Sequence, residues 1–399
     1  MRAEANARPL KVLHLGKYYH PDSGGIETVT KDLSQGAARA GCEVTVLCFG
    51  RVDRPVQERF DGVDVVRTPI WKLVSSQPFG WKYVREFLRR AGEFDIVHVH
   101  VPNMLAALML LMARIPGKVV VHWHADVVNK GWIGTLMRPL EWTMLRRADA
   151  LVATSQAYAD ASPQLRRFGG KVHIVPIGIE DSDVFDDDDD ASGDTPAPDV
   201  GAQATPALDG TPVVLAVGRL VPYKGFDVLI AAARLLPAAC RVVIVGGGER
   251  RAELEALIRQ QQVGDRVLLA GRLGDDALRS LFQSAAIYCL PSVSRAEAFG
   301  VVLLEAMAHG LPIVASNIAG SGVPWVNQHD VTGLNVPIGD AQALATALSQ
   351  LLSDPALRER MGHESRRRFE AEFTAARASR RMLDLYGTLA GRRVEELAA

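Results

Sequence analysis

The sequence predicts an α/β protein built from two doubly wound, parallel-sheet domains in tandem. From Lys11 onward, short apolar runs are followed by a glycine or polar turn and then by apolar residues at helical spacing. This alternation stops at an acidic, proline-containing stretch and begins again at Pro212. A length of 399 residues suits two domains, and a composition of 48% hydrophobic and 23% charged residues excludes a disordered chain.

The first half carries the opening series of strand and helix signals. We expect a strand at residues 11–15, a glycine turn at 23–25 and a helix that ends near Gly41. Most later apolar runs are continuous, as parallel strands buried on both faces require. They predict strands at residues 43–49, 95–100, 118–122, 150–153 and 172–176.

Residues 181–210 separate the two series. Five consecutive aspartates, 186–190, precede a stretch with almost no large apolar side chain, and such a composition cannot form a core. Adjacent carboxylates cannot converge on one cation, so we interpret the run as a solvated linker rather than a cation site. The expected domains are therefore residues 1–180 and 211–379.

The second half repeats the alternation from Pro212. Strands are expected at residues 212–218, 241–245, 266–270, 287–290, 312–315 and 333–336, and helices at 227–236, 252–260, 276–283, 300–309 and 341–353. Residues 358–399 predict a closing helix whose apolar stripe is Met382, Leu385, Tyr386 and Leu389. Ligands of such sheets bind at the carboxyl ends of the strands, so a cleft between the two domains is the expected ligand site.

Bulk composition limits the partners and the compartment. Lys and Arg number 45 against 46 Asp and Glu, so no global field favours nucleic acid. The four cysteines match neither a zinc spacing nor a disulfide framework, which favours a reducing cytoplasm. Residues 1–9 lack the apolar core of a signal peptide. The apolar run 104–113 is about half the roughly 20 residues needed to cross a bilayer, so we expect a buried core helix there.

The segment 294–310 places two glutamates eight residues apart at the start of an expected helix. Glu297 lies just before the amino end of that helix, and Glu305 lies more than one turn inside it. Free N–H groups and the positive dipole end near Gly300 attract phosphate oxygens without a metal. Either glutamate alone is more often a solvated or capping residue, but the combination indicates a site for a charged ligand.

Two cations follow the first strand of the second half. Arg219 and Lys224 lie five residues apart in a turn between Gly218 and Gly225. An arginine forks onto phosphate oxygens and a lysine supplies a compact charge, so the pair suits a diphosphate and its stabilisation as a leaving group. The alternative is a pair of ordinary surface charges.

Two glycine turns give weaker signals. Gly24-Gly25 lies between a strand and a helix, where a backbone can approach phosphates, but it lacks a full dinucleotide fingerprint and the Walker A lysine spacing. The three glycines 246–248 also follow a strand, and a simple turn explains them equally well.

A strand of the first half ends in His122-Trp123-His124-Ala125-Asp126. The two histidines point to the same face of the strand, and Asp126 could orient or charge one of them. A metal site therefore has to be considered, but no third ligand lies at a suitable local spacing, so we expect none. A structural histidine is the alternative to ligand contact by His124.

In this order, the motifs resemble those of the retaining nucleotide-sugar glycosyltransferases of family 4. The resemblance runs from about Lys11 to Phe373 and is more specific in the second half. It implies the GT-B architecture, in which the second Rossmann-like domain holds the nucleotide-sugar donor and the first mainly holds the acceptor. It also implies that the final helix, about residues 380–399, packs on the first domain. The acidic run at 186–190 departs from the family pattern.

The resemblance assigns roles residue by residue. In the second domain, it implies that Arg219 and Lys224 contact the diphosphate and that Glu305 contacts the ribose. Glu297, with the backbone of Phe299, Gly300 and Val301, would contact the sugar hydroxyls. Backbone groups near Arg272 and Leu273 would contact the base. In the first domain, Gly25 would approach the phosphates and His124 would contact the transferred sugar near its reacting carbon.

The family also implies the chemistry. Transfer would proceed with retention and without a metal or cofactor, and the leaving phosphate would accept the acceptor's proton. Residues 294–300 and 320–327 resemble bacterial enzymes of surface-polysaccharide assembly, several of them similar to mannosyltransferases that use GDP-mannose, although a UDP-hexose stays open. The acceptor would be a glycan or a lipid-linked molecule. The rival interpretations are a nucleotide-sugar epimerase, a non-catalytic nucleotide-binding regulator and a dehydrogenase.

Aromatic and basic residues gather in two stretches of the first half. Helices with such faces can rest on anionic membranes, and the alternative is an ordinary solvated helix face. The membrane interpretation predicts a cytoplasmic protein held peripherally at the inner face of the membrane. The two stretches are Trp71, Lys72, Trp81, Lys82, Arg85, Arg89 and Arg90, and Arg138, Trp142, Arg146 and Arg147.

Overall fold

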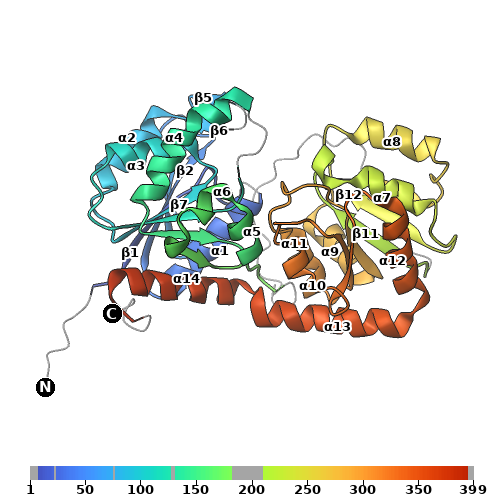
Figure 1. The fold of residues 1–399 in the computed structure, drawn as a ribbon. Helices are drawn as coiled ribbons and strands as arrows, with labels where there is room; N and C mark the ends of the chain where they lie inside the picture. Colours follow the sequence, from blue (N-terminus) through green and yellow to red (C-terminus); the bar gives the residue numbers. More distant parts are fainter. Residues whose placement is uncertain (1–7, 22–23, 75–76, 127–130, 182–209, 394–399) are drawn as a thin grey trace, which may run out of the picture. The chain divides into compact units, whose positions relative to one another are not determined.

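The structure, a computed structural model, describes residues 8–21, 24–74, 77–126, 131–181 and 210–393 (Figure 1). The chain forms two compact units. Unit 1 comprises Met1–Glu180 with Phe373–Ala399, and unit 2 comprises Asp181–Glu372. The aspartate run 186–190 and nearly all of the expected linker lie outside the described residues.

Unit 1 is built on a sheet in the order β10-β9-β8-β7-β1-β2-β4-β3, whose described pairs are all parallel except β3 with β4. The central strands β1 and β7 are almost entirely buried, as their apolar sequences require. The strands are β1 (Lys11–Leu15), β2 (Glu43–Gly50), β3 (Val56–Phe60), β4 (Val63–Pro69), β7 (Ile96–Val101), β8 (Lys118–Trp123), β9 (Ala150–Ala153) and β10 (Val172–Ile174).

Helices connect these strands, as in a doubly wound fold. They are α1 (Gly25–Arg39), α2 (Trp81–Arg90), α3 (Met104–Met112), α4 (Gly131–Arg147), α5 (Gln156–Ala161) and α6 (Pro163–Arg166). The edge strand β3, its neighbour β4, and the antiparallel pair of β5 (Lys72–Val74) with β6 (Gln77–Phe79) were not predicted. Strand β3 is exposed and polar, so it has no apolar run, and Asp64 and Arg67 interrupt the run of β4.

Unit 2 contains an all-parallel sheet in the order β13-β12-β11-β14-β15-β16. Its strands are β11 (Val213–Val217), β12 (Arg241–Val245), β13 (Val267–Gly271), β14 (Ile287–Leu290), β15 (Ile313–Ser316) and β16 (Gly333–Val336). Its helices are α7 (Phe226–Ala233), α8 (Arg251–Gln260), α9 (Asp275–Ser284), α10 (Val301–Ala308), α11 (Val323–Val326), α12 (Ala341–Ser353) and α13 (Pro355–Glu372). Two tandem parallel-sheet domains, the predicted fold class, are therefore confirmed.

The C-terminal segment is two helices rather than the single one expected. Helix α13 stops at Glu372, and α14 (Ala375–Ala390) starts after Thr374, whose hydroxyl accepts a hydrogen bond from the Arg377 amide. Ile179 pairs through its backbone with Phe373 and Ala375 at this break. Helix α14 packs along α1 in unit 1 (Figure 1). The return to unit 1 thus begins at Phe373, several residues earlier than expected.

Helix α3 differs from the core helix expected at residues 104–113. Ala106, Met109 and Leu110 are buried, whereas Leu111 and Met112 are about half exposed, at 50% and 57%. The helix therefore covers the sheet with one side only. Among the described residues, no helix combines the length and the apolarity that a bilayer crossing requires.

Candidate active site

A buried cation–carboxylate pair forms the centre of the candidate site in unit 2. The Lys224 Nζ lies 2.6 Å from Glu297 Oε2, and both side chains are about nine-tenths buried. The Ser292 hydroxyl donates to the same carboxylate oxygen at 2.8 Å. Lys224 ends the 3-10 turn Pro222–Lys224 after β11, and Glu297 lies in the loop before α10. Two segments predicted separately therefore converge on one ion pair.

Glycines make room for this pair. A Cβ at Gly218 would lie 3.2 Å from the Lys224 Cε, so the aliphatic part of the lysine packs on this glycine. Gly225 adopts φ +66°, and a Cβ there would lie 2.1 Å from the Pro291 carbonyl oxygen. The turn that carries Lys224 can thus approach the end of β14 only because Gly225 lacks a side chain.

The amino end of α10 faces the same loop. Gly300 is the N-cap residue of this helix, with φ +80°, and no side chain forms a capping hydrogen bond there. Phe299 is buried, with its ring centroid 6.2 Å from that of Trp325. The Ser321 hydroxyl donates to the Glu297 carbonyl, and the Gly322 amide donates to the Ala298 carbonyl at 2.7 Å. The backbone of residues 297–300 is therefore fixed in place before any ligand arrives.

Glu305 lies on α10, inside its second turn, and is half-buried. Crowding by protein atoms raises the pKa of its carboxyl to about 7, and the nearby positive charge of Lys224 opposes this rise. The charges of Glu305 and Glu297 add to burial in raising the pKa of the phenol of Tyr288 in β14. Both glutamates therefore act on the same part of unit 2.

Replacing Glu305 with Gln should change the pH dependence of stability. Because the folded-state pKa exceeds the usual 4.5, the folded protein binds a proton that the unfolded chain has lost, so stability falls as pH rises from about 4.5 to 7. Between pH 5 and pH 8, the free energy of unfolding of Glu305→Gln should therefore rise by about 2 kcal/mol relative to that of the wild type. The partial exposure of Glu305 reduces the effect to this size. Denaturant unfolding at both pH values measures this, with the exposed Glu359→Gln as control; a pH-independent difference would show that the carboxyl of Glu305 ionises normally.

The remaining predicted residues of unit 2 lie around a glycine turn. Arg219 is exposed, and its guanidinium donates to the Tyr223 hydroxyl at 3.3 Å. Arg272 is exposed and Leu273 half-buried, and a Cβ at Gly247 would lie 3.0 Å from the Arg272 Nε. A Cβ at Gly246 would lie 1.9 Å from the Gly218 carbonyl oxygen. Close backbone packing thus accounts for Gly246.

In unit 1, Gly25 is exposed and begins α1. The residue before it, Gly24, caps the helix without a side-chain hydrogen bond. Asp126, considered as a partner for a histidine, accepts hydrogen bonds from Trp123 Nε1 at 2.9 Å and from the Ser162 hydroxyl at 2.8 Å.

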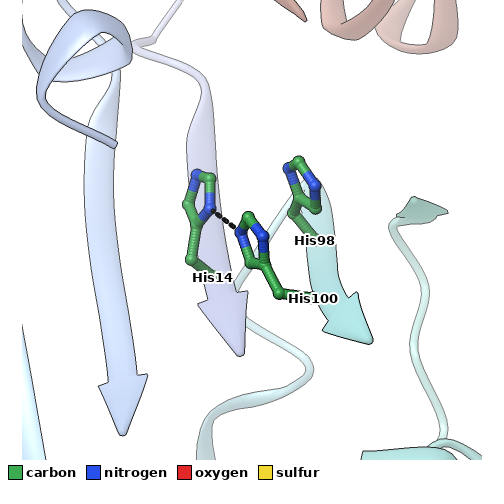
Figure 2. Close-up of side chains that lie close together, drawn as sticks. All are labelled: His14, His98 and His100. Atoms are coloured by element: carbon green, nitrogen blue, oxygen red, sulfur yellow. Dashed lines mark hydrogen bonds between the residues drawn. The ribbon is translucent and has the colours of Figure 1, made fainter. Parts of the chain in front are cut away.

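His124 belongs to a cluster of five buried histidines. Its Nε2 lies 3.0 Å from His100 Nδ1, and burial together with the charge of Lys17 lowers the pKa of His124 to about 3. No third ligand lies at a suitable local spacing in the sequence, but β1 and β7 bring three more imidazoles from elsewhere in the chain. Figure 2 shows this part of the cluster, with His14 and His100 hydrogen-bonded. The missed residues are His14, His98 and His100.

A signal for these residues exists in the sequence. His98 and His100 alternate along β7 in the same way as His122 and His124 at the end of β8, and His100 pairs in register with His122. His14 pairs in register with His98. Side chains at paired positions of neighbouring parallel strands share a face, so three apolar runs that each contain histidine, two of them at alternate positions, predict one cluster.

Comparison with known proteins agrees with this geometry. Residues 202–368 match the family model described as glycosyl transferases group 1, and residues 23–183 match the model described as Glycosyltransferase Family 4. The chain is 32% identical to O-antigen chain mannosyltransferase C of Escherichia coli over 95% of its length and 99% of the relative's, and 31% identical to a D-rhamnosyltransferase of Pseudomonas aeruginosa over 92% and 93%.

The solved structures agree on the fold. Sucrose-phosphate synthase from Thermosynechococcus elongatus superimposes with a TM-score of 0.76 over 96% of this chain and 99% of its own, at 23% identity. Two predominantly parallel sheets in tandem, with this similarity, define the GT-B fold. Because the match to its relatives spans almost the whole sequence, the chain belongs to glycosyltransferase family 4.

Proposed function

We propose that this enzyme transfers a hexose, with mannose the favoured sugar, from a nucleotide diphosphate to a glycan or lipid-linked acceptor with retention of configuration. The observation that carries the proposal is the buried Lys224–Glu297 pair beside the amino end of α10. A fixed cation and free helix N–H groups are what a pyrophosphate requires. The names of the two relatives, an O-antigen chain mannosyltransferase and a D-rhamnosyltransferase, support a hexose donor in polysaccharide synthesis.

The proposed donor contacts are those that the family resemblance implies. Lys224 and the flexible, exposed Arg219 bind the diphosphate, and Glu305 accepts hydrogen bonds from the ribose hydroxyls. Glu297, held by Lys224 and Ser292, accepts from sugar hydroxyls beside the amides of Phe299, Gly300 and Val301. Arg272 and Leu273 border the base. In unit 1, we assign the phosphates to Gly25 and the transferred sugar to His124.

The chemistry needs little covalent help from the protein. The bond between the sugar's anomeric carbon and the phosphate oxygen breaks, and the acceptor oxygen bonds to the same face of that carbon. The acceptor's proton passes to the departing phosphate oxygen. Lys224, Arg219 and the α10 amides stabilise the negative charge that grows on the diphosphate. Electrostatic stabilisation by such preorganised groups is usually the largest single contribution to catalysis.

A thermal-shift panel of GDP- and UDP-sugars tests the donor. At 100 times its dissociation constant, a bound donor adds about 2.7 kcal/mol of stability, and we expect GDP-mannose to give the largest shift. The shift and the subsequent transfer to an acceptor should survive EDTA. If a UDP-hexose gave the largest shift, it would replace GDP-mannose as the proposed donor. If EDTA abolished activity and a divalent cation restored it, the metal-free mechanism would be overturned. Turnover of the donor without an acceptor would favour an epimerase.

We also propose that unit 1 rests on an anionic membrane, where a lipid-linked acceptor would be found. Helices α2 and α3 pack together and expose apolar side chains beside the cations Lys82, Arg85 and Arg89. Anionic headgroups complement such a mixture. The exposed apolar residues here and at the β5–β6 pair are Trp71, Leu73, Val74, Trp81, Leu88, Leu108, Leu111 and Met112.

The second basic and aromatic stretch supports this surface less. Trp142 is half-buried, and its ring centroid lies 5.4 Å from that of Phe168. The Arg167 guanidinium lies 4.8 Å from the Trp142 ring centroid. Arg147 donates to the Ala113 carbonyl at 3.2 Å, and the side chain of Arg138 lies outside the described residues.

Vesicle flotation tests the membrane surface. The protein should float with vesicles that contain phosphatidylglycerol at low salt, and less so at high salt because ions screen the attraction. Trp71→Ser combined with Trp81→Ser should reduce flotation, whereas Val331→Ser, which changes an exposed apolar residue of unit 2, should not. Absent flotation, or flotation insensitive to both salt and the double substitution, would contradict the proposal.

A further inference from the structure

Four of the five clustered histidines, His14, His98, His100 and His124, are linked by hydrogen bonds and the Tyr386 hydroxyl into a chain that ends on the C-terminal helix. His124 Nε2 lies 3.0 Å from His100 Nδ1, and His100 Nε2 lies 3.0 Å from His14 Nδ1 (Figure 2). The Tyr386 hydroxyl on α14 lies 3.5 Å from His14 Nε2 and 2.5 Å from His98 Nδ1. His14 and His98 have no exposed surface, whereas His124 keeps 6%, so the chain opens toward solvent at His124.

These imidazoles are neutral at physiological pH. Burial lowers the pKa of His14 to about 3 and holds that of His98 and His100 well below the ordinary value. A neutral imidazole has one N–H donor and one bare nitrogen, so each contact in the chain needs one proton and one lone pair. The direction of one hydrogen bond therefore fixes the direction of all the others.

The contacts of Tyr386 set this direction. The contact of the Tyr386 hydroxyl with His98 Nδ1, at 2.5 Å, is much shorter than its contact with His14 Nε2, at 3.5 Å, so we assign the hydroxyl proton to His98 Nδ1. A hydroxyl has one proton, so Tyr386 must accept from His14 Nε2–H. His14 Nδ1 is then bare and accepts from His100 Nε2–H, and His100 Nδ1 accepts from His124 Nε2–H.

We infer that this chain holds His124 as the Nε2–H tautomer and leaves Nδ1 as a bare acceptor for a hydroxyl of the transferred sugar. The contact with sugar rests on the proposed function, whereas the tautomer does not. Tyr386, His14 and His100 are then positioning residues. A histidine prevented from rotating or changing tautomer needs no reorganisation when the substrate binds.

A metal site is the competing explanation for so many histidines. The nitrogens of His100, His122 and His124 lie within 4.8 Å of one another, as do those of His14, His98 and His100. However, in the pairs His14/His100 and His100/His124 the ring nitrogens point at each other across only 3.0 Å, a gap that suits a shared proton and is too short to hold a cation between two bonds of about 2.0–2.1 Å each. The charge acting on His124 is the cation Lys17, which disfavours a second cation.

Long-range ¹H–¹⁵N NMR of the full-length, histidine-labelled protein tests the tautomer without substrate. We expect one bare Nδ1 and one protonated Nε2 for His124, assigned by its loss in His124→Ala. A protonated Nδ1, an imidazolium, or a metal ion that copurifies and shifts these signals would overturn the inference. A wild type with the expected tautomer but without sugar transfer would overturn only the proposed function.

Variants of His100 and Tyr386 test the chain itself. His100→Asn places a carbonyl oxygen where Nδ1 accepts, so it should keep the His124 tautomer, whereas His100→Leu should give mixed tautomers and roughly tenfold lower kcat with donor affinity retained. Tyr386→Phe should also mix the tautomers. The control Tyr19→Phe removes another buried hydroxyl, bonded to Ser34, and should leave the His124 signals unchanged. A single unchanged tautomer in both His100→Leu and Tyr386→Phe would overturn the chain.

Discussion

Lys224→Met should reduce affinity for a nucleoside diphosphate, and the rate of sugar transfer, by about 100-fold or more. The methionine keeps the aliphatic contact with Gly218 but removes the cation that we assign to the phosphates. It also leaves Glu297 buried without its partner at 2.6 Å, and breaking a buried pair from one side costs about 3–5 kcal/mol. Calorimetry with GDP, beside denaturant unfolding, measures both effects.

A second substitution separates binding from stability. In Lys224→Met with Glu297→Gln, the uncompensated charge is gone, so stability should largely return while diphosphate affinity stays low. Arg250→Met is the matched control, because it breaks a 3.0 Å ion pair with Asp227 elsewhere in unit 2 and should lower stability alone. Unchanged GDP affinity in Lys224→Met would refute the assignment of the cation.

Much of unit 2 could be predicted because its signals are local. Strands such as Arg241–Val245 and Ile287–Leu290 are almost continuously apolar, and their predicted bounds match the structure. The break between α13 and α14 was missed because it is set by tertiary contacts. Ile179, almost two hundred residues earlier in the chain, pairs with Phe373 and Ala375 there, and the flanking sequence alone retains helical spacing.

The candidate site shows the same limit. Lys224 and Glu297 were each found from their own motifs, but that they bond to one another depends on β11 lying beside β14 in the sheet. Similarly, His122 and His124 were noticed because they share one strand, whereas His14 and His98 join them only through the order of β1, β7 and β8. Residue types and local spacing thus identify the participants, while the strand order decides which of them meet.

His124→Ala should lower kcat by about 100-fold while changing donor affinity little. We assign this side chain to the sugar near its reacting carbon, where an interaction that strengthens in the transition state affects turnover more than binding. Single-turnover transfer and calorimetry with the donor measure the two quantities separately. His173→Ala is the matched control, since this exposed histidine on β10 belongs to the same sheet and lies outside the cluster. If donor affinity fell in His124→Ala while kcat stayed the same, the side chain would serve binding alone, because a uniform loss of binding leaves the barrier from the bound state unchanged.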